Sequence, residues 1–148
     1  MERKYYHIPT LPAGTTVATV DWNVVPAAQI DTYRWLDGGY EPHAEARLAF
    51  LPGYGFALRM SCIERSPRAI YSGYNEPVYT DSCLEFFAAW AEGSPTHDRR
   101  YMNMEMNARG TLLSCLGTDR HARVPVRDIT GGSIPDVRGE ILPDRWSV

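Results

Sequence analysis

The sequence lacks several features that mark large functional classes. Its 148 residues contain no apolar run long enough to span a bilayer, and no signal-peptide-like run follows the basic start MERK. The formal net charge is −3 without blocks of like charge, so the basic footprint of a nucleic-acid binder is missing. If the chain is complete, these absences predict a cytoplasmic protein that binds neither membranes nor nucleic acid.

Reactive side chains are also scarce. Cys62, Cys83 and Cys115 make an odd number without a CxxC pair, and we interpret them as reduced, apolar side chains. The four histidines show no HxH or HxxxH spacing, so no metal site is predicted. Neither a Gly-rich phosphate loop nor a G-x-S-x-G nucleophile motif occurs. The sequence therefore carries no zinc, nucleotide or serine-nucleophile motif.

Short apolar runs separated by turn residues are what the sequence does contain. Eleven prolines and twelve glycines interrupt runs rich in Val, Leu, Phe, Tyr and Met. This pattern predicts one all-β domain over residues 1–148, a jelly-roll-like β-sandwich of two antiparallel sheets. A short helical turn is expected near VPAAQI. The expected strands are roughly 16–22, 29–36, 45–51, 55–64, 82–90, 100–107 and 110–117, with less marked ones near 122–127 and 145–148.

Two hairpins are well marked. In ARLAFLPGYGFALRMSC, Pro52 and Gly53 suit the central positions of a type II turn between two strands. In YMNMEMNARGTLLSCLG, Gly110 can take the left-handed conformation that a short hairpin loop needs. By contrast, residues 128–144 look irregular.

The run YMNMEMN alternates strictly between methionine and polar residues. Side chains alternate across a strand, so the two sets point to opposite sides of a sheet. We expect the methionines to face the core, whereas the polar set has fixed donors and acceptors that suit recognition of hydroxyl groups. The polar set is Tyr101, Asn103, Glu105 and Asn107.

A carboxylate also stands at the centre of the apolar run VYTDSCLEFFAAW. This residue, Glu85, falls on the same side of its strand as Cys83 and Phe87. If the strands are neighbours, Arg59, Glu85, Asn103 and Glu105 share one face. Two interpretations stay open, a cross-strand ladder of ion pairs or the floor of a ligand site.

Aromatic residues favour the ligand site. Flat rings stack on the C–H faces of sugars while planar polar side chains take the hydroxyls, and Trp35 is the best candidate platform. A tyrosine-rich segment, AIYSGYNEPVY, adds further aromatic side chains in a predicted loop.

These segments resemble the central motifs of the family 9-like carbohydrate-binding modules, which include small bacterial proteins. PVYTDSCLEFFAAW contains the Asp-Ser pair of the family (Asp81, Ser82), followed by Glu85 and by Phe87 or Phe86. RRYMNMEMNARGTLLSCLG contains its later Asn and Gly (Asn107, Gly110). IDTYRWLDGGYEP and LRMSCIE resemble the upstream strands, so the similarity extends to about residue 127.

The resemblance implies a β-sandwich that binds a small saccharide without cleaving it, and some members hold structural calcium. We therefore expect no catalytic residues and no cofactor. The expected carbohydrate-binding residues are Trp35, Arg59, Glu85, Tyr101, Asn103, Glu105 and Asn107. No tryptophan pair flanking one cleft is evident in this sequence.

The C-terminus departs from the family pattern. Relatives continue past the point corresponding to DRWSV, so the chain is either naturally short or lacks its last strands. A missing strand would leave an edge that pairs with a second copy. We therefore expect a homodimer in which residues near 141–148 contribute to the interface, with Trp146 as its anchor.

Three other functions stay open. Glu85 and Glu105 would be the acid and base of a glycoside hydrolase if they stood in a cleft at the right separation. Met60 or Met104 with His121 would serve as axial ligands of a haem, although a methionine core stripe explains them as well. Otherwise, the polar face would dock a protein as an interaction module without a sugar ligand.

Overall fold

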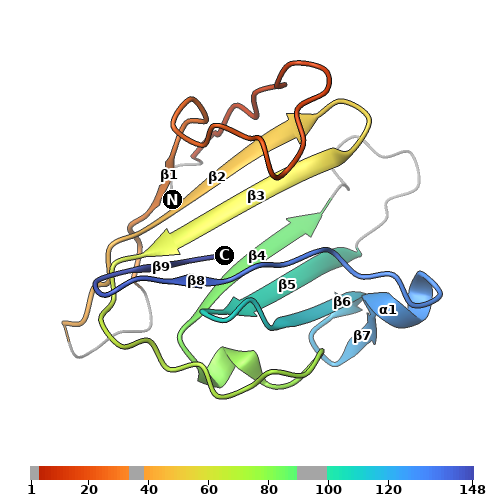
Figure 1. The fold of residues 1–148 in the computed structure, drawn as a ribbon. Coiled ribbons are helices and arrows are strands. Elements are labelled where there is room, and N and C mark those ends of the chain that lie inside the picture. Colours follow the sequence, from red (N-terminus) through yellow and green to blue (C-terminus); the bar gives the residue numbers. More distant parts are fainter. Residues whose placement is uncertain (1–3, 34–38, 90–99) are drawn as a thin grey trace. The chain divides into compact units, whose positions relative to one another are not determined.

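The computed structural model describes residues 4–33, 39–89 and 100–148. The chain forms two compact units, residues 1–64 with Ser147 and residues 65–146 with Val148, each described separately below. Figure 1 traces the elements along the chain. They are β1 (Ala28–Ile30), β2 (Ala44–Leu51), β3 (Gly55–Cys62), the 3₁₀ turn η1 (Val78–Thr80), β4 (Cys83–Ala89), β5 (Tyr101–Asn107), β6 (Leu112–Asp119), β7 (Ala122–Pro125), α1 (Val126–Ile129), β8 (Glu140–Ile141) and β9 (Trp146–Ser147).

The strands form two antiparallel sheets, one of five strands in the order β1-β2-β3-β9-β8 and one of four in the order β4-β5-β6-β7. Helical structure within the described ranges is confined to η1 and to α1, which has four residues. The predicted fold class, an all-β sandwich of two antiparallel sheets, is confirmed. The prediction of a single domain over residues 1–148 stays a prediction.

The β2–β3 hairpin dominates the first unit (Figure 1). Its turn has Pro52 and Gly53 at the centre, Gly53 has a φ of 87°, and the Tyr54 N–H donates to the Leu51 carbonyl at 3.0 Å. This is the predicted type II turn, which needs a left-handed residue at its third position. Beside the hairpin, a small apolar core is formed by Leu11, Val25, Ala49, Leu51 and Ala57, with Val20 and Trp22 packed against it.

The chain before β2 differs from the prediction. Residues 16–22 form turns rather than a strand, because the Thr16 N–H donates to the Thr19 hydroxyl and the Thr19 N–H to the Thr16 carbonyl. Such local bonds compete with a sheet ladder. The expected helical turn near VPAAQI is also wrong, since β1 there pairs with Ala44–Ala46 of β2. Long-range pairing has overridden local propensity.

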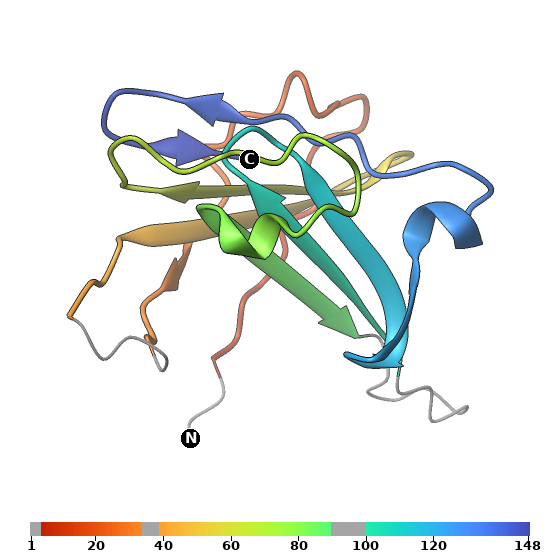
Figure 2. The ribbon, with the colours of Figure 1, turned by 90° about the horizontal axis from the view of Figure 1, so that it is seen from below.

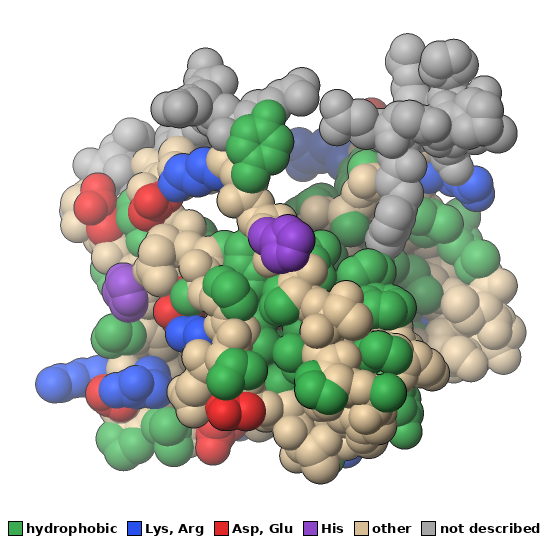
Figure 3. Space-filling model, turned by 90° about the horizontal axis from the view of Figure 1, so that it is seen from above, with side chains coloured by type: hydrophobic (Ala, Val, Ile, Leu, Met, Phe, Trp, Pro, Cys, Tyr) green, Lys and Arg blue, Asp and Glu red, His purple; other side chains and the backbone are tan. Residues whose placement is uncertain are grey.

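Hydrophobic side chains are also common on the surface. Tyr5, Val17 and Val24 are exposed in the first unit. Figure 3 shows one face of the molecule, on which hydrophobic side chains lie among polar ones and the Lys and Arg side chains are scattered rather than gathered.

In the second unit, β4, β5, β6 and β7 form a continuous antiparallel sheet, followed by α1 (Figure 2). The β5–β6 hairpin closes as predicted. Gly110 has a φ of 81°, and its N–H donates to the Asn107 carbonyl at 2.8 Å. The predicted strands 82–90, 100–107 and 110–117 agree with the described strands to within a few residues.

The burial of β5 reverses the expectation. Asn103, Glu105 and Asn107 are all buried, whereas of the three methionines only Met106 is buried and Met102 and Met104 are half-buried. The prediction that the methionine side is the more buried one is therefore wrong. Polar side chains tolerate burial when they hydrogen-bond one another and the backbone, and those of β5 do so.

Trp146 also contradicts the sequence prediction. It lies in β9, which has a neighbouring strand on either side in the five-stranded sheet. Its side chain is 1% exposed within the single chain. A residue buried in this way has no surface to present to a second copy, so Trp146 is not the anchor of a dimer interface.

Candidate functional site

One face of the four-stranded sheet gathers aromatic and charged side chains. Strand register places Glu85 directly opposite Glu105, and Phe87 directly opposite Asn103. The Phe87 ring lies 5.9 Å from the Tyr101 ring, centroid to centroid. Arg123 joins the same face from β7, because it pairs with Gly117, which pairs with Tyr101. We call this set the polar face: Glu85, Phe87, Tyr101, Asn103, Glu105 and Arg123.

One hydrogen bond and one ion pair form the floor of the polar face. Asn103 Nδ2 donates to Glu105 Oε1 at 2.8 Å, and Arg123 Nη1 lies 3.9 Å from the same oxygen. Asn103 is fully buried, and its Oδ1 has no hydrogen-bond partner among the described residues. A buried acceptor without a donor is costly, so Asn103 Oδ1 is an acceptor that the described residues leave unsatisfied.

The polar face is partly open to solvent. Phe87 is 50% exposed and Glu85 is also exposed, whereas Asn103 and Glu105 are buried. The buried pair is thus the base of the face, and the exposed ring and carboxylate are the groups that a ligand would meet first.

Like charges dominate the electrostatics. Although Glu85 is exposed, the protein around its carboxyl group partly desolvates that group and raises its pKa. The neighbouring Glu105 carboxylate raises the pKa further, and the Arg123 guanidinium partly offsets this by lowering it. The predicted cross-strand ladder of ion pairs cannot run along one sheet through Arg59, because β3 carries Arg59 in the five-stranded sheet, where Arg59 Nη2 lies 3.4 Å from Ser147 Oγ. Glu85, Tyr101, Asn103 and Glu105 share a face as predicted, and Arg59 does not join them. Trp35 lies outside the described residues.

Asn107 has a structural task at the end of the same strand. Its Nδ2 donates to the Tyr71 carbonyl and to Asp81 Oδ2, both at 2.9 Å. Its Oδ1 accepts from the N–H groups of Arg109 and Thr111 at 3.1 and 3.0 Å. Both amide hydrogens and both lone pairs are used, so Asn107 has nothing left to offer a ligand.

Asp81 is the partner that completes this structural network. Its Oδ2 also accepts from the N–H groups of Ile70 and Tyr71 at 2.9 and 3.1 Å. Arg68 Nε lies 3.3 Å from Asp81 Oδ1, an ion pair without hydrogen-bond geometry. Asp81 and Asn107, the Asp and Asn of the family motif, therefore connect the segment before β4 to the β5–β6 turn by hydrogen bonds.

Two residues of the polar face were not among the predicted site residues. Phe87 was placed on the correct side of its strand by alternation, and its exposure is what makes it a candidate platform. Arg123 comes from the less marked strand near 122–127. The pairing partner of Arg123 could not be predicted from the sequence, because the register of the β6–β7 pairing shifts between Gly117 and Asp119.

The cysteines agree with their interpretation as reduced, apolar side chains. All three are free. Burial raises the pKa of Cys83 to about 12 and that of Cys62 to about 11, and it also raises that of Cys115. Protonated thiols are poor nucleophiles at neutral pH.

Groups of metal-binding side chains do not form in the parts of the chain that the structure describes, and a haem held by Met60 or Met104 with His121 stays a prediction. There, no three His, Cys, Asp or Glu side chains come together to hold a metal ion, so no residues are assigned to the calcium implied by the resemblance. Met60 is buried in β3, and His121 is exposed in the β6–β7 turn, where its N–H donates to Asp119 Oδ1.

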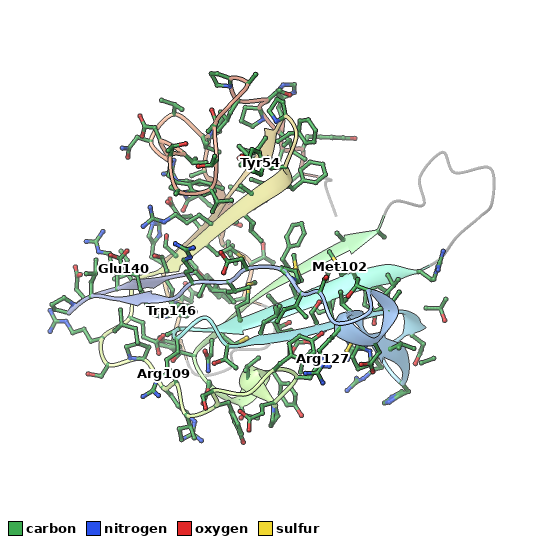
Figure 4. All side chains as sticks on the ribbon, turned by 45° about the vertical axis from the view of Figure 1, so that its right-hand side comes forward. Tyr54, Met102, Arg109, Arg127, Glu140 and Trp146 are labelled. Atoms are coloured by element: carbon green, nitrogen blue, oxygen red, sulfur yellow. The ribbon has the colours of Figure 1, made fainter. Side chains whose placement is uncertain are left out.

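The second unit also has a shallow depression of about 650 Å³. It lies beside the β5–β6 turn, which carries Arg109, and includes Tyr74, Thr111 and Asp136 (Figure 4). Tyr74 is held in place because its hydroxyl donates to the Ser114 carbonyl and accepts from the Arg127 N–H, both at 3.1 Å. None of the predicted site residues lines this depression.

An all-β chain with rings and carboxylates on one sheet face has the features of a carbohydrate-binding module, and comparison with known proteins agrees. The family model of Carbohydrate-binding family 9 matches residues 15–132, so the chain belongs to this family. A crystal structure described as a "putative carbohydrate-binding protein" from Bacteroides uniformis is similar, with a TM-score of 0.69 and 27% identity, covering 95% of this chain and 68% of that one. No curated protein matches.

The family predicted from the Asp81–Ser82 and Asn107–Gly110 motifs is thereby confirmed. Within residues 4–33, 39–89 and 100–148, no helix has the length and apolar character needed to cross a membrane.

Proposed function

We propose that the chain binds a small saccharide, without cleaving it, through the polar face. The observation that carries this proposal is the combination on one sheet face of an exposed ring, Phe87, with the side chains of Glu85, Asn103 and Glu105. An apolar platform beside a few fixed polar groups is the usual composition of a small-molecule site. Membership of a carbohydrate-binding family supports sugar as the ligand class. The cytoplasmic location and the homodimer stay predictions.

Titration calorimetry tests this proposal. Neutral and amino monosaccharides and disaccharides are titrated into the wild-type chain, and each is also scored for a shift in melting temperature. Binding of at least one sugar is expected, and binding should weaken in a Phe87→Ala variant. If no sugar releases heat or shifts the melt, saccharide binding is wrong and the polar face is a structural feature of the sheet.

Glycoside hydrolysis is a second candidate because Glu85 and Glu105 face each other across β4 and β5. A retaining enzyme uses two carboxyl groups that lie close together, and opposed residues on neighbouring strands have adjacent side chains. Against hydrolysis, Glu105 Oε1 is already bound by Asn103. Release of nitrophenol from aryl glycosides by the wild type, abolished in Glu85→Gln and in Glu105→Gln, would establish the enzyme and exclude a purely binding role.

Besides the polar face, a second surface has the features of a protein-interaction site. Phe50 and Phe56 pair across the β2–β3 hairpin with centroids 5.4 Å apart, and both are exposed, as is Tyr54 at the turn (Figure 4). Exposed rings of this kind are common in interfaces. If the Phe56→Ala variant binds sugar as the wild type does, this hairpin has no part in saccharide binding.

A further inference from the structure

The polar face has more negative than positive charge. Register places the side chains of Glu85 and Glu105 on it, and Arg123 is the one cation among the residues of β4 to β7 that share this side. Arg123 is also offset from the pair, since its Nη1 lies 3.9 Å from Glu105 Oε1. With a neutral sugar bound, the repulsion between the two carboxylates would be offset only in part, by Arg123.

Hydrogen-bond acceptors gather at the carboxylate pair of the polar face. Both carboxylates are acceptors when ionised, and Asn103 adds a third acceptor in its Oδ1, which is buried and lacks a partner among the described residues. The donors of the polar face belong to Tyr101, Asn103 and Arg123, and one N–H of the Asn103 amide is already used by Glu105. A complementary ligand should therefore bring several donors and a positive charge.

We infer that the saccharide bound by the polar face is an amino sugar, with its protonated amine between Glu85 and Glu105 and its ring against Phe87. An ammonium group supplies three donors and a unit positive charge, whereas a hydroxyl supplies one donor. The opposed carboxylates accept charge-assisted hydrogen bonds from it, and the exposed Phe87 ring covers the C–H face of the sugar. This inference rests on the proposed saccharide-binding function.

Three sugars that differ only at one ring carbon test the inference. Glucosamine, N-acetylglucosamine and glucose are titrated calorimetrically at a pH below the pKa of the free amine. Glucosamine should bind at least about tenfold more tightly than either neutral sugar, as expected for a charge-assisted hydrogen bond. The preference should weaken as salt is raised, because salt screens partly exposed charges.

Variants then test whether Glu85 and Glu105 cause the preference for glucosamine. Glu85→Gln and Glu105→Gln should each remove most of the preference for glucosamine over the two neutral sugars, and thermal melts check that each variant is folded. Asp136→Asn is the control, because Asp136 is an exposed carboxylate paired with Arg138 and loses the same charge away from the polar face. The control should keep the preference. A preference that survives both Glu variants would overturn the inference.

The remaining outcomes separate this inference from the proposed function. If glucose or N-acetylglucosamine binds as tightly as glucosamine, the amino-sugar inference is wrong and saccharide binding stands. If no sugar binds, both are wrong. If calcium chloride alone shifts the melt and this shift is lost in Glu85→Gln, the carboxylate pair is a cation site and the amino-sugar inference is overturned.

Discussion

Glu85 and Glu105 lie directly opposite each other on the neighbouring antiparallel strands β4 and β5. Opposed residues have Cβ atoms about 4.5–5.5 Å apart, so the two negative charges repel at close range. A pair of like charges in this position destabilises a sheet, and its retention on a partly exposed face is easier to explain by ligand binding than by folding. Four predictions follow from the surroundings of this pair and of the sheet that carries it.

The first prediction is that Glu85→Gln stabilises the chain at neutral pH. Burial and Glu105 raise the pKa of Glu85, against the opposing effect of Arg123. A carboxyl with a raised pKa in the folded state favours folding below its unfolded pKa, and this contribution is lost as the pH rises through the folded pKa. The variant should therefore melt higher than the wild type near pH 7 and lose this advantage in acid.

Thermal melts across this pH range measure the difference. Asp136→Asn is again the control for the loss of one charge, and its melting temperature should follow that of the wild type. A Glu85→Gln variant that melts lower than the wild type at neutral pH would show that Glu85 forms a stabilising ion pair instead.

The second prediction concerns Asp81. Burial raises its pKa, but hydrogen bonds from Asn107, Tyr71 and Ile70, together with the charge of Arg68, outweigh burial and hold the pKa below its ordinary value. Such a carboxyl stabilises the fold above its unfolded pKa, and the contribution is lost as the pH falls through the folded pKa. Asp81→Asn should cost about 2 kcal/mol at neutral pH, in the range for hydrogen bonds to a charged group.

Denaturant unfolding at neutral and acidic pH gives the two free energies of unfolding. The cost of Asp81→Asn should shrink in acid, where the wild-type carboxyl is protonated as well. Arg109→Ala, an exposed change in the adjoining turn, should alter stability by less than about 0.5 kcal/mol. A pH-independent cost for Asp81→Asn would contradict the lowered pKa.

The third prediction is that Gly117→Ala disturbs the edge of the sheet. A Cβ at this position would lie 2.1 Å from the Ala122 carbonyl oxygen and 2.7 Å from the Arg123 Cα, both backbone atoms of the neighbouring segment. Backbone cannot move aside as a flexible side chain does, so we expect a loss of about 1–3 kcal/mol. Thr118→Ala next to it is exposed and should be close to neutral. Denaturant melts that show equal, small effects would disprove the close approach.

The fourth prediction is that Phe87→Ala weakens sugar binding with little effect on folding. Covering about 50 Å² of ring face is worth about 1.3 kcal/mol at the usual coefficient, close to a tenfold change in affinity. The side chain is 50% exposed, so its removal leaves only a small cavity. Calorimetric titration measures the affinity, and Phe86→Ala, on the opposite side of β4, is the matched variant. Equal loss of binding in both would argue against Phe87 as the platform.

Local rules predicted much of the second unit. Alternation placed Glu85 and Phe87 on one side of β4 and Asn103 and Glu105 on one side of β5, and the register confirms both. The two turns were also predicted correctly, because Gly53 and Gly110 have the positive φ that their turn types need. Side-chain alternation and turn geometry depend only on neighbouring residues, so they can be read along the chain.

Asn107 shows where such rules stop. Its position at the end of YMNMEMN suggested one more polar group of the ligand site. Its amide is instead used by a hydrogen-bond network that includes Asp81, 26 residues earlier in the chain. Which hydrogen bonds a side chain makes depends on segments that folding brings together.

The sequence by itself determined the all-β class, the two hairpins, the family motifs and the side of the strand on which each site residue falls. Tertiary structure decided which side of β5 is buried, that Arg59 stands in one sheet and Glu85 in the other, that Arg123 supplies the cation, and that Trp146 is covered. The physical reason is that a period of two assigns residues to sides but does not say what covers each side. Strand order and covering follow from pairings between distant segments, which the sequence does not express locally.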